Sequence, residues 1–260
     1  MWEKMKSIWV RMNRWQRIII IFMLLHFKAL PGGQVGFRCN DPALSHPFRG
    51  DTISWSLLFS TTVLVPLIVV NVNTNNWPKH QALIWYKEYL YGMLLNLIVI
   101  RLLKILIGSP RPHFFDTCMP EEALTCQGNE YVPSYTCTKA HWLTESNKSF
   151  PSGHTSLGFH AALFLAYYIE RRIGGGGPGV RTAQAVIAGA GICCAASRVW
   201  DRRHHWWDVL GATAIAAPIL SYTVQSLCNN FECSTPKKQL DNKSHNSGTD
   251  SANVVTNSTT

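Results

Sequence analysis

Acidic residues are scarce in this chain of 260 residues, in which 15 Asp and Glu stand against 24 Lys and Arg. Charged residues make up only 15% of the sequence, whereas roughly a quarter is usual in a soluble domain. The acidic residues form no cluster near the polar motifs described below, and no cysteine spacing typical of zinc occurs, so we expect neither a metal nor another cofactor. The surplus cations are scattered among apolar runs. This pattern argues against nucleic acid as a partner and favours a membrane and an anionic substrate.

Apolar residues make up 47% of the chain and gather into runs, although long polar loops keep the mean hydropathy at +0.01. Runs of this kind are typical of membrane-spanning helices. We therefore expect an all-α polytopic membrane protein with six transmembrane helices. The expected spans are residues 18–30, 53–72, 89–107, 155–169 (the fourth starting near Ser152 if it is to be long enough), 183–196 and 209–227.

The run at 18–30 is short for a span, which needs about 20 residues, and it contains Lys28. A basic start followed by a short apolar core is also typical of a signal peptide. No small-x-small cleavage site follows, because the next residues are Pro31-Gly32-Gly33. We interpret the run as a retained span, and either interpretation leaves the following chain on the outer side.

Lys and Arg concentrate near both termini and in the second and fourth connections between spans. The positive-inside rule therefore places both termini in the cytoplasm. We divide the chain into a basic N-terminus (1–17), a six-helix domain (18–228) with a long outer loop (108–150), and a disordered cytoplasmic tail (229–260) rich in Ser, Thr and Asn. The plasma membrane and the endoplasmic reticulum or Golgi both fit this topology. The sequon that starts at Asn147 then lies on the side where glycans are added.

Four of the eight cysteines fall in the expected outer loops. They are Cys39, Cys118, Cys126 and Cys137. On an oxidising side they can form two disulfides, and three pairings are open. Cys193-Cys194 lies inside an apolar run and is interpreted as packing, whereas Cys228 and Cys233 follow the last span and are candidates for palmitate.

Three polar stretches end apolar runs, and the expected topology brings all three to the outer face. They are Lys104 with Arg111-Pro112, then Pro151-Ser152-Gly153-His154, then Ser197-Arg198 followed by His204 and Asp208. Ionisable groups at a membrane boundary are functional candidates, although snorkelling cations are the alternative for the first stretch. Together these side chains suit the binding and transfer of a phosphate.

Each stretch has a chemical role in this interpretation. Arg111 can grip two phosphate oxygens, while Lys104 supplies a point charge. Ser152 can cap a helix whose free N–H groups attract an anion, and Gly153 lets the backbone approach it; a capped helix with an incidental His154 is the alternative. His154 can protonate a leaving group.

His204 and Asp208 are four residues apart, which places them on one face of a helix that would begin the sixth span. The aspartate can then hold one imidazole nitrogen while the other attacks phosphorus. Asp208 is also favourable at a helix start for dipole reasons alone. We interpret His205 as a surface or supporting residue, and Trp206-Trp207 as part of an interfacial belt.

The combination of the three stretches resembles the signature of the type 2 phosphatidic acid phosphatase superfamily, and the local sequence is similar to eukaryotic lipid phosphate phosphatases. The resemblance covers roughly residues 32–227. It implies a membrane enzyme that hydrolyses phosphatidate, lysophosphatidate, ceramide 1-phosphate and sphingosine 1-phosphate without Mg²⁺, and homo-oligomers occur in the family. It also implies that His204 is the nucleophile, His154 the acid and Asp208 its partner. The implied phosphate-binding residues are Lys104, Arg111, Pro112, Ser152, Gly153, Ser197 and Arg198.

Three alternatives stay open from the sequence. The same histidines would serve a lipid phosphotransferase that passes the phosphoryl group to an alcohol. Basic residues at span ends also suit an anion transporter. A membrane scaffold that only binds lipid is a further alternative, and the intact His154, His204 and Asp208 argue against it.

Overall fold

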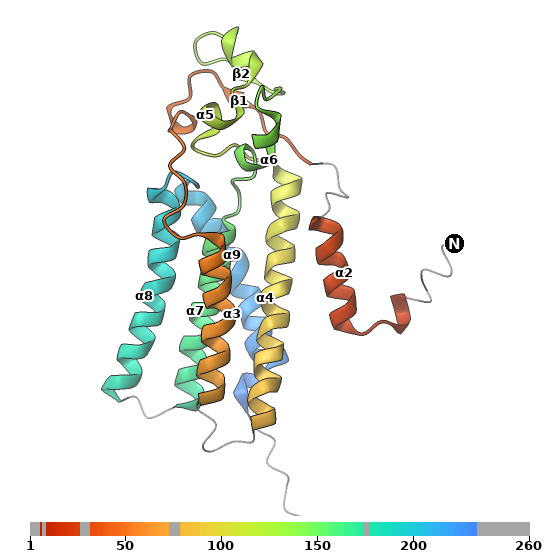
Figure 1. The fold of residues 1–260 in the computed structure, drawn as a ribbon, viewed down its shortest axis with the longest axis vertical. Helices are drawn as coiled ribbons and strands as arrows, with labels where there is room; N and C mark the ends of the chain where they lie inside the picture. The colour runs from red at the N-terminus through yellow and green to blue at the C-terminus, as the bar shows by residue number, and fades with distance from the viewer. Residues whose placement is uncertain (1–5, 7–8, 27–31, 73–78, 174–176, 233–260) are drawn as a thin grey trace, which may run out of the picture.

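The computed structural model describes residues 6, 9–26, 32–72, 79–173 and 177–232, and it is mostly helical (Figure 1). The helices are α2 (Arg14–His26), α3 (Trp55–Val72), α4 (Lys79–Ile107), α5 (Phe114–Cys118), α6 (Leu143–Ser146), α7 (Gly153–Arg172), α8 (Pro178–Trp200) and α9 (Trp206–Tyr222), which continues as a π-turn (Thr223–Leu227). The strands are β1 (Phe37–Arg38) and β2 (Tyr131–Val132), and the 3-10 turns are Pro42–Leu44, Glu121–Leu124, Ala140–Trp142 and Asn229–Phe231.

Helix α7 is the centre of the bundle, because it packs against α3, α4, α8 and α9. Its buried side chains include Leu157 and Phe164, which join Trp85 and Tyr89 of α4 in the main core. Small residues allow the close approach of α8: the site where Gly158 would carry a Cβ lies 3.3 Å from the Cys194 sulfur. The Ala- and Gly-rich sequence of α8 therefore serves helix packing, as expected.

Among the described residues, three helices are long and apolar enough to cross a membrane: His80–Ile107, Pro178–Trp200 and Trp206–Leu227. Helix α3 is also apolar, but its apolar stretch, Trp55–Asn71, is shorter than these three. Helix α7 carries His, Ser and Gly on its buried faces, which lowers its hydropathy even though it lies inside the bundle. The chain is thus a helical membrane protein.

Several helix bounds differ from the expected spans. Helix α4 starts ten residues before the expected 89, because polar residues continue the helix and the buried Glu88 is paired with Arg14 of α2. Helix α8 likewise extends past both ends of 183–196. The expected first span, 18–30, corresponds to α2, and residues 27–31 lie outside the described part of the chain.

A small cap covers the end of the bundle where α4 ends and α7 begins (Figure 1). Here the expectation of an all-α fold was wrong in one detail, because β1 and β2 pair antiparallel, with Phe37 opposite Val132. The two loops that supply these strands are also joined by disulfides. The pairs are Cys39–Cys126 and Cys118–Cys137, which resolves the three open pairings.

The predicted boundary of the tail at 229 was wrong, because Asn229–Phe231 forms a 3-10 turn; residues 233–260 lie outside the described part of the chain. Phe231 is buried against Trp85 and Phe164, so the chain stays in the core to that point. Cys228 is also buried, with its sulfur facing the Trp85 carbonyl, so the prediction that it carries palmitate was wrong. Cys233 lies outside the described residues.

Helix α9 makes a close contact that links the bundle to the second polar motif. A Cβ at Gly211 would lie 2.3 Å from the Phe150 ring, whereas a Cβ at Gly189 of α8 meets nothing within 4 Å. We predict that Gly211→Ala lowers the free energy of unfolding by about 1–3 kcal/mol through overpacking. Gly189→Ala should be neutral or stabilise by up to about 1 kcal/mol, because alanine favours helix. Denaturation of both variants in detergent tests this, and equal effects would contradict it.

Candidate functional site

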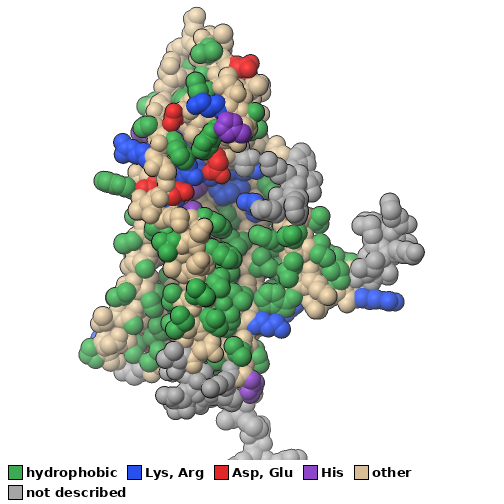
Figure 2. Space-filling model, viewed as in Figure 1, with side chains coloured by type: hydrophobic (Ala, Val, Ile, Leu, Met, Phe, Trp, Pro, Cys, Tyr) green, Lys and Arg blue, Asp and Glu red, His purple; other side chains and the backbone are tan. Residues whose placement is uncertain are grey.

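A cavity of about 550 Å³ lies where the cap meets the bundle. Six of the predicted site residues line it: Lys104, Arg111, Gly153, His154, Arg198 and His204. Figure 2 shows charged and histidine side chains gathered in a band below the cap, above a lower bundle that is mainly hydrophobic. The three motifs, which are far apart in the sequence, therefore converge at the polar boundary of the bundle.

His204 lies in the loop before α9, so the prediction that it shares a helix face with Asp208 was wrong. The helix starts at Trp206, because His205 takes the N-cap position and its backbone N–H donates to Asp208 Oδ2 at 2.9 Å. The expected proximity nevertheless exists, since His204 Nδ1 lies 3.5 Å from Asp208 Oδ2. His205 is more than a surface residue, because its Nδ1 is 3.4 Å from the same oxygen.

The imidazole of His204 is neutral in this site. Its side chain is buried, and burial lowers the pKa of His204 well below its usual value; Lys104 and Arg111 lower it further, while Asp208 acts in the opposite direction. The Ser149 hydroxyl donates to the same Asp208 oxygen, Oδ2. A neutral imidazole with one nitrogen facing a fixed carboxylate is suited to act as a nucleophile.

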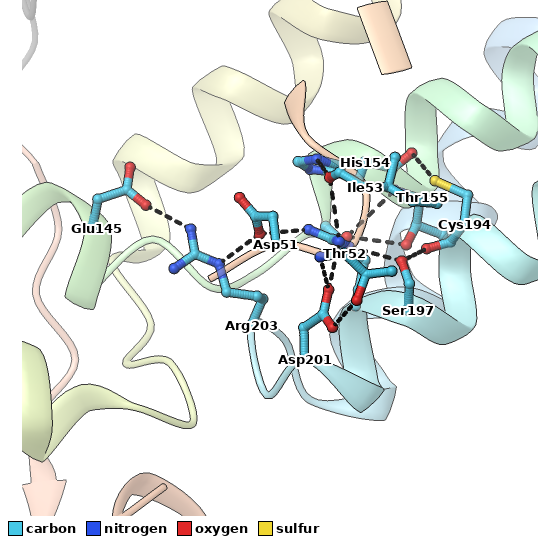
Figure 3. Close-up of polar contacts among 12 residues, drawn as sticks. Asp51, Thr52, Ile53, Glu145, His154, Thr155, Cys194, Ser197, Asp201 and Arg203 are labelled. Atoms are coloured by element: carbon cyan, nitrogen blue, oxygen red, sulfur yellow. Dashed lines mark hydrogen bonds and ion pairs between the residues drawn. The ribbon is translucent and has the colours of Figure 1, made fainter. Parts of the chain in front are cut away.

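His154 stands in the first turn of α7, where Ser152 caps the helix as predicted by accepting from the Thr155 N–H. Its Nε2 is 3.1 Å from the Ile53 carbonyl oxygen (Figure 3). Its ring also meets the Trp55 ring edge to face. These contacts hold the ring in the cavity wall, where a proton donor could reach a bound phosphate ester.

Lys104 and Arg111 face each other across the backbone that leads into the second motif. Lys104 Nζ donates to the carbonyl oxygens of Lys148 and Ser149 at 2.7 and 3.2 Å. Arg111 pairs with Glu145 at 3.3 Å. Burial lowers the pKa of Arg111 to about 10, so its guanidinium stays charged at neutral pH.

Arg198 is almost completely buried and has fixed partners. Its guanidinium bonds to Asp51 and Asp201, each at 2.8 Å, and its Nε donates to the Ser197 hydroxyl. Asp201 also accepts from the N–H of Thr52 at 2.8 Å. Two carboxylates thus hold Arg198 at the cavity wall in one orientation.

Four predicted residues lie behind the cavity wall. Ser152 caps α7, Ser197 orients Arg198, and the Pro112 carbonyl accepts from the His46 N–H. Asp208 lies behind His204, with its Oδ2 3.5 Å from the His204 Nδ1. The site thus separates groups that face the cavity from groups that position them.

The sequence analysis assigned no role at the site to five residues: Asp51, Glu145, Ser149, Asp201 and Arg203. Arg203, Glu145 and Asp51 line the cavity. Arg203 and His204 are neighbours, and this adjacency was the available signal. Asp51 and Glu145 bond to arginines that lie 34 to 152 residues away in the sequence, which spacing cannot reveal.

The proposed glycosylation position is enclosed. Asn147 is 8% exposed, and Ser149 of the same sequon is fully buried with its hydroxyl on Asp208. This leaves little room for a glycan in the folded protein, and glycosylation at Asn147 stays a prediction.

A family model described as the PAP2 superfamily matches residues 85–231. The chain therefore belongs to the PAP2 superfamily, and it is an enzyme of the phosphatase class, as its motifs indicated.

Individual relatives agree with this assignment. Phospholipid phosphatase 2 of Mus musculus is 29% identical over 221 residues, 78% of this chain and 79% of its own. Phospholipid phosphatase 2 of Homo sapiens is 25% identical over 255 residues, 88% of each chain. A Drosophila melanogaster protein named as a candidate phosphatidate phosphatase is 31% identical over 220 residues, 70% of this chain and 58% of its own length.

His113 gives a pH test of the cap. Burial, Arg111 and Arg203 lower the pKa of His113 to about 3. The unfolded chain then binds a proton between about pH 6.5 and 3 that the folded protein does not, so stability falls as the pH falls through this window. We predict that His113→Gln reduces the slope of unfolding free energy against pH by up to about 1.4 kcal/mol per unit. The exposed His141→Gln is the control; an unchanged slope in His113→Gln would contradict the assignment.

Proposed function

We propose that this protein is a Mg²⁺-independent lipid phosphate phosphatase that acts through a phosphohistidine on His204. The proposal rests above all on one arrangement: a buried neutral imidazole, backed by Asp208, shares a cavity with Lys104, Arg111 and Arg198. The proposed substrates are phosphatidate, lysophosphatidate, ceramide 1-phosphate and sphingosine 1-phosphate; the names of the relatives mention phosphatidate and phospholipids.

In the first step the His204 nitrogen that faces away from Asp208 attacks phosphorus. The phosphorus–oxygen bond to the lipid alcohol breaks. His154 enters this step as an imidazolium with its Nε2–H on the Ile53 carbonyl, and it gives the Nδ1 proton to the departing oxygen. Asp208 stabilises the positive imidazole ring through Nδ1. In the second step His154 takes a proton from water, the water oxygen attacks phosphorus, and phosphate leaves with His204 restored.

Three cations stabilise the charge on the phosphoryl oxygens. Arg198 is fixed in advance by its two carboxylates, so it loses little freedom on binding. Arg111 and Lys104 come from either side of the turn that ends α4. Three positive groups in this arrangement can carry the role that Mg²⁺ has in many phosphoryl transfers.

The apolar part of the cavity supports a lipid substrate. Phe22 of α2, Phe59 of α3, and Leu97 and Ile100 of α4 line the same cavity as the cations. A phosphate at the polar end would leave the alkyl part of the molecule against these side chains. This arrangement suits an amphiphile that reaches the site from the bilayer.

The proposed topology has six spans, formed by α2, α3, α4, α7, α8 and α9. Both termini are cytoplasmic, and the cap with its two disulfides lies outside or in the lumen, where disulfides form. The plasma membrane and the endoplasmic reticulum or Golgi both satisfy this, and the protein can form homo-oligomers.

The function is tested by phosphate release from phosphatidate in detergent micelles with excess EDTA. We expect release by the wild type, loss of release in His204→Ala, and a decrease in kcat of about 10²–10⁴-fold in His154→Ala, since general acid catalysis contributes that much. His141→Ala, in the exposed outer loop, is the control. Release that requires Mg²⁺, or that survives His204→Ala, would refute the mechanism.

Ser149 gives a second test, because its hydroxyl holds Asp208 and also completes the sequon. We predict that Ser149→Ala lowers kcat about tenfold, since a hydrogen bond to a charged group is lost. Ser149→Thr keeps both the hydroxyl and the sequon, and Asn147→Gln removes only the sequon. If Asn147→Gln lowers kcat as much as Ser149→Ala does, the effect belongs to the sequon and not to the hydrogen bond.

A further inference from the structure

Charges of opposite sign alternate along one side of the cavity. Asp51 Oδ1 bridges Arg198 at 2.8 Å and Arg203 at 3.0 Å. Glu145 Oε2 in turn bridges Arg203 at 3.2 Å and Arg111 at 3.3 Å. Figure 3 shows Arg203 between the two carboxylates, with Asp51 on the side of Asp201 and Glu145 on the other. Arg203 is therefore linked through Asp51 to Arg198 and through Glu145 to Arg111, the two arginines of the predicted phosphate motifs.

Further contacts hold the guanidinium of Arg203 in place. It lies 4.7 Å from the centre of the Phe48 ring, and its Nη1 is 3.3 Å from His113 Nε2. Because His113 is neutral, that nitrogen can accept from Arg203 while Nδ1 donates to the Thr117 hydroxyl at 3.1 Å. The Arg203 side chain is 9% exposed, and the residue lines the cavity beside His204.

Glu145 differs from the arginines that it contacts. Its side chain is 46% exposed, and it stands on the four-residue helix α6 of the cap. Both of its ion pairs run through a single oxygen, which faces two guanidiniums. A phosphate monoester carries more negative charge and more acceptor oxygens than a carboxylate, so it can replace this oxygen between Arg111 and Arg203.

We propose that Arg203 is a further phosphate-binding residue, and that Glu145 occupies the place of a phosphate oxygen between Arg111 and Arg203 until the substrate enters. The inference rests on the proposed function in one respect, namely that the cavity takes a phosphate. It predicts competition: the Glu145 carboxylate and the incoming phosphate exclude each other. Removal of the carboxylate should then tighten phosphate binding, whereas removal of the Arg203 guanidinium should weaken it.

The probe is inorganic phosphate, and its affinity for the purified full-length chain in detergent is measured by calorimetry. We expect Arg203→Gln to weaken phosphate binding about tenfold or more, as for the loss of a charge-assisted hydrogen bond. The phosphate affinity of Arg203→Lys should fall between those of Arg203→Gln and the wild type, because lysine keeps the positive charge but cannot donate two parallel hydrogen bonds. Glu145→Gln should tighten binding severalfold.

Matched controls separate these effects from net charge. Arg202→Gln removes a neighbouring exposed cation, and Glu121→Gln removes an exposed carboxylate of the same outer loop. Both should leave phosphate affinity within about twofold, because exposed charges at a distance are screened. An Arg203→Gln variant that binds phosphate as the wild type does would overturn the proposal. A Glu145→Gln variant that binds phosphate more weakly would also overturn it, because Glu145 would then position the arginines and not compete.

Two further measurements keep the outcomes distinct. Thermal unfolding of each variant shows whether it is folded, and Glu145→Gln, which changes a half-exposed side chain, keeps the test available if Arg203→Gln unfolds. Phosphate release from phosphatidate is measured on the wild type in parallel. If phosphate binds with the predicted order of affinities but is not released from the lipid, the proposed function fails and this inference stands.

Discussion

The burial of three arginines at the junction of cap and bundle is the constraint on which the rest of the site depends. Arg111, Arg198 and Arg203 are each about nine-tenths buried or more, and a buried cation without a partner costs several kcal/mol. Asp51 and Glu145 supply the partners, one from the loop before α3 and one from the cap. The need of the buried arginines for anionic partners therefore holds the cap and the loop before α3 against the bundle. The disulfides and the bundle core only bring these segments near each other.

This constraint also explains why the site is largely formed in advance. The loop between α8 and α9 begins with Asp201, which anchors both Arg198 and the Thr52 backbone. It ends at His205, whose N–H donates to the Asp208 carboxylate of α9. His204 is held between these two anchors, with its own N–H on the Arg198 carbonyl. The same contacts that satisfy buried charge thus set the position of the imidazole, and a substrate phosphate meets cations whose orientation is already fixed.

The sequence predicts the parts of this arrangement that are local. Lys104, Arg111, His154, Arg198 and His204 were recognised because each stands in a short motif at the end of an apolar run, and the helix cap at Ser152 follows from its own turn. The carboxylates that pair with the arginines were missed, because ion pairs between residues far apart in the chain produce no repeating pattern in the sequence. Helix ends were also misjudged where tertiary contacts override composition: Glu88 is compatible with a longer α4 only because Arg14 pairs with it, and the N-cap at His205 depends on Asp208.

The central claim is that His204 forms a covalent bond to phosphorus, and rapid quenching of the enzyme with ³²P-labelled phosphatidate tests it most directly. The account predicts an acid-labile label that peptide mapping places on His204. His154→Ala should carry more label than the wild type where the loss of the base slows hydrolysis of the phosphohistidine more than its formation. Label on another residue, or turnover of the wild type with label absent at every quench time, would contradict it.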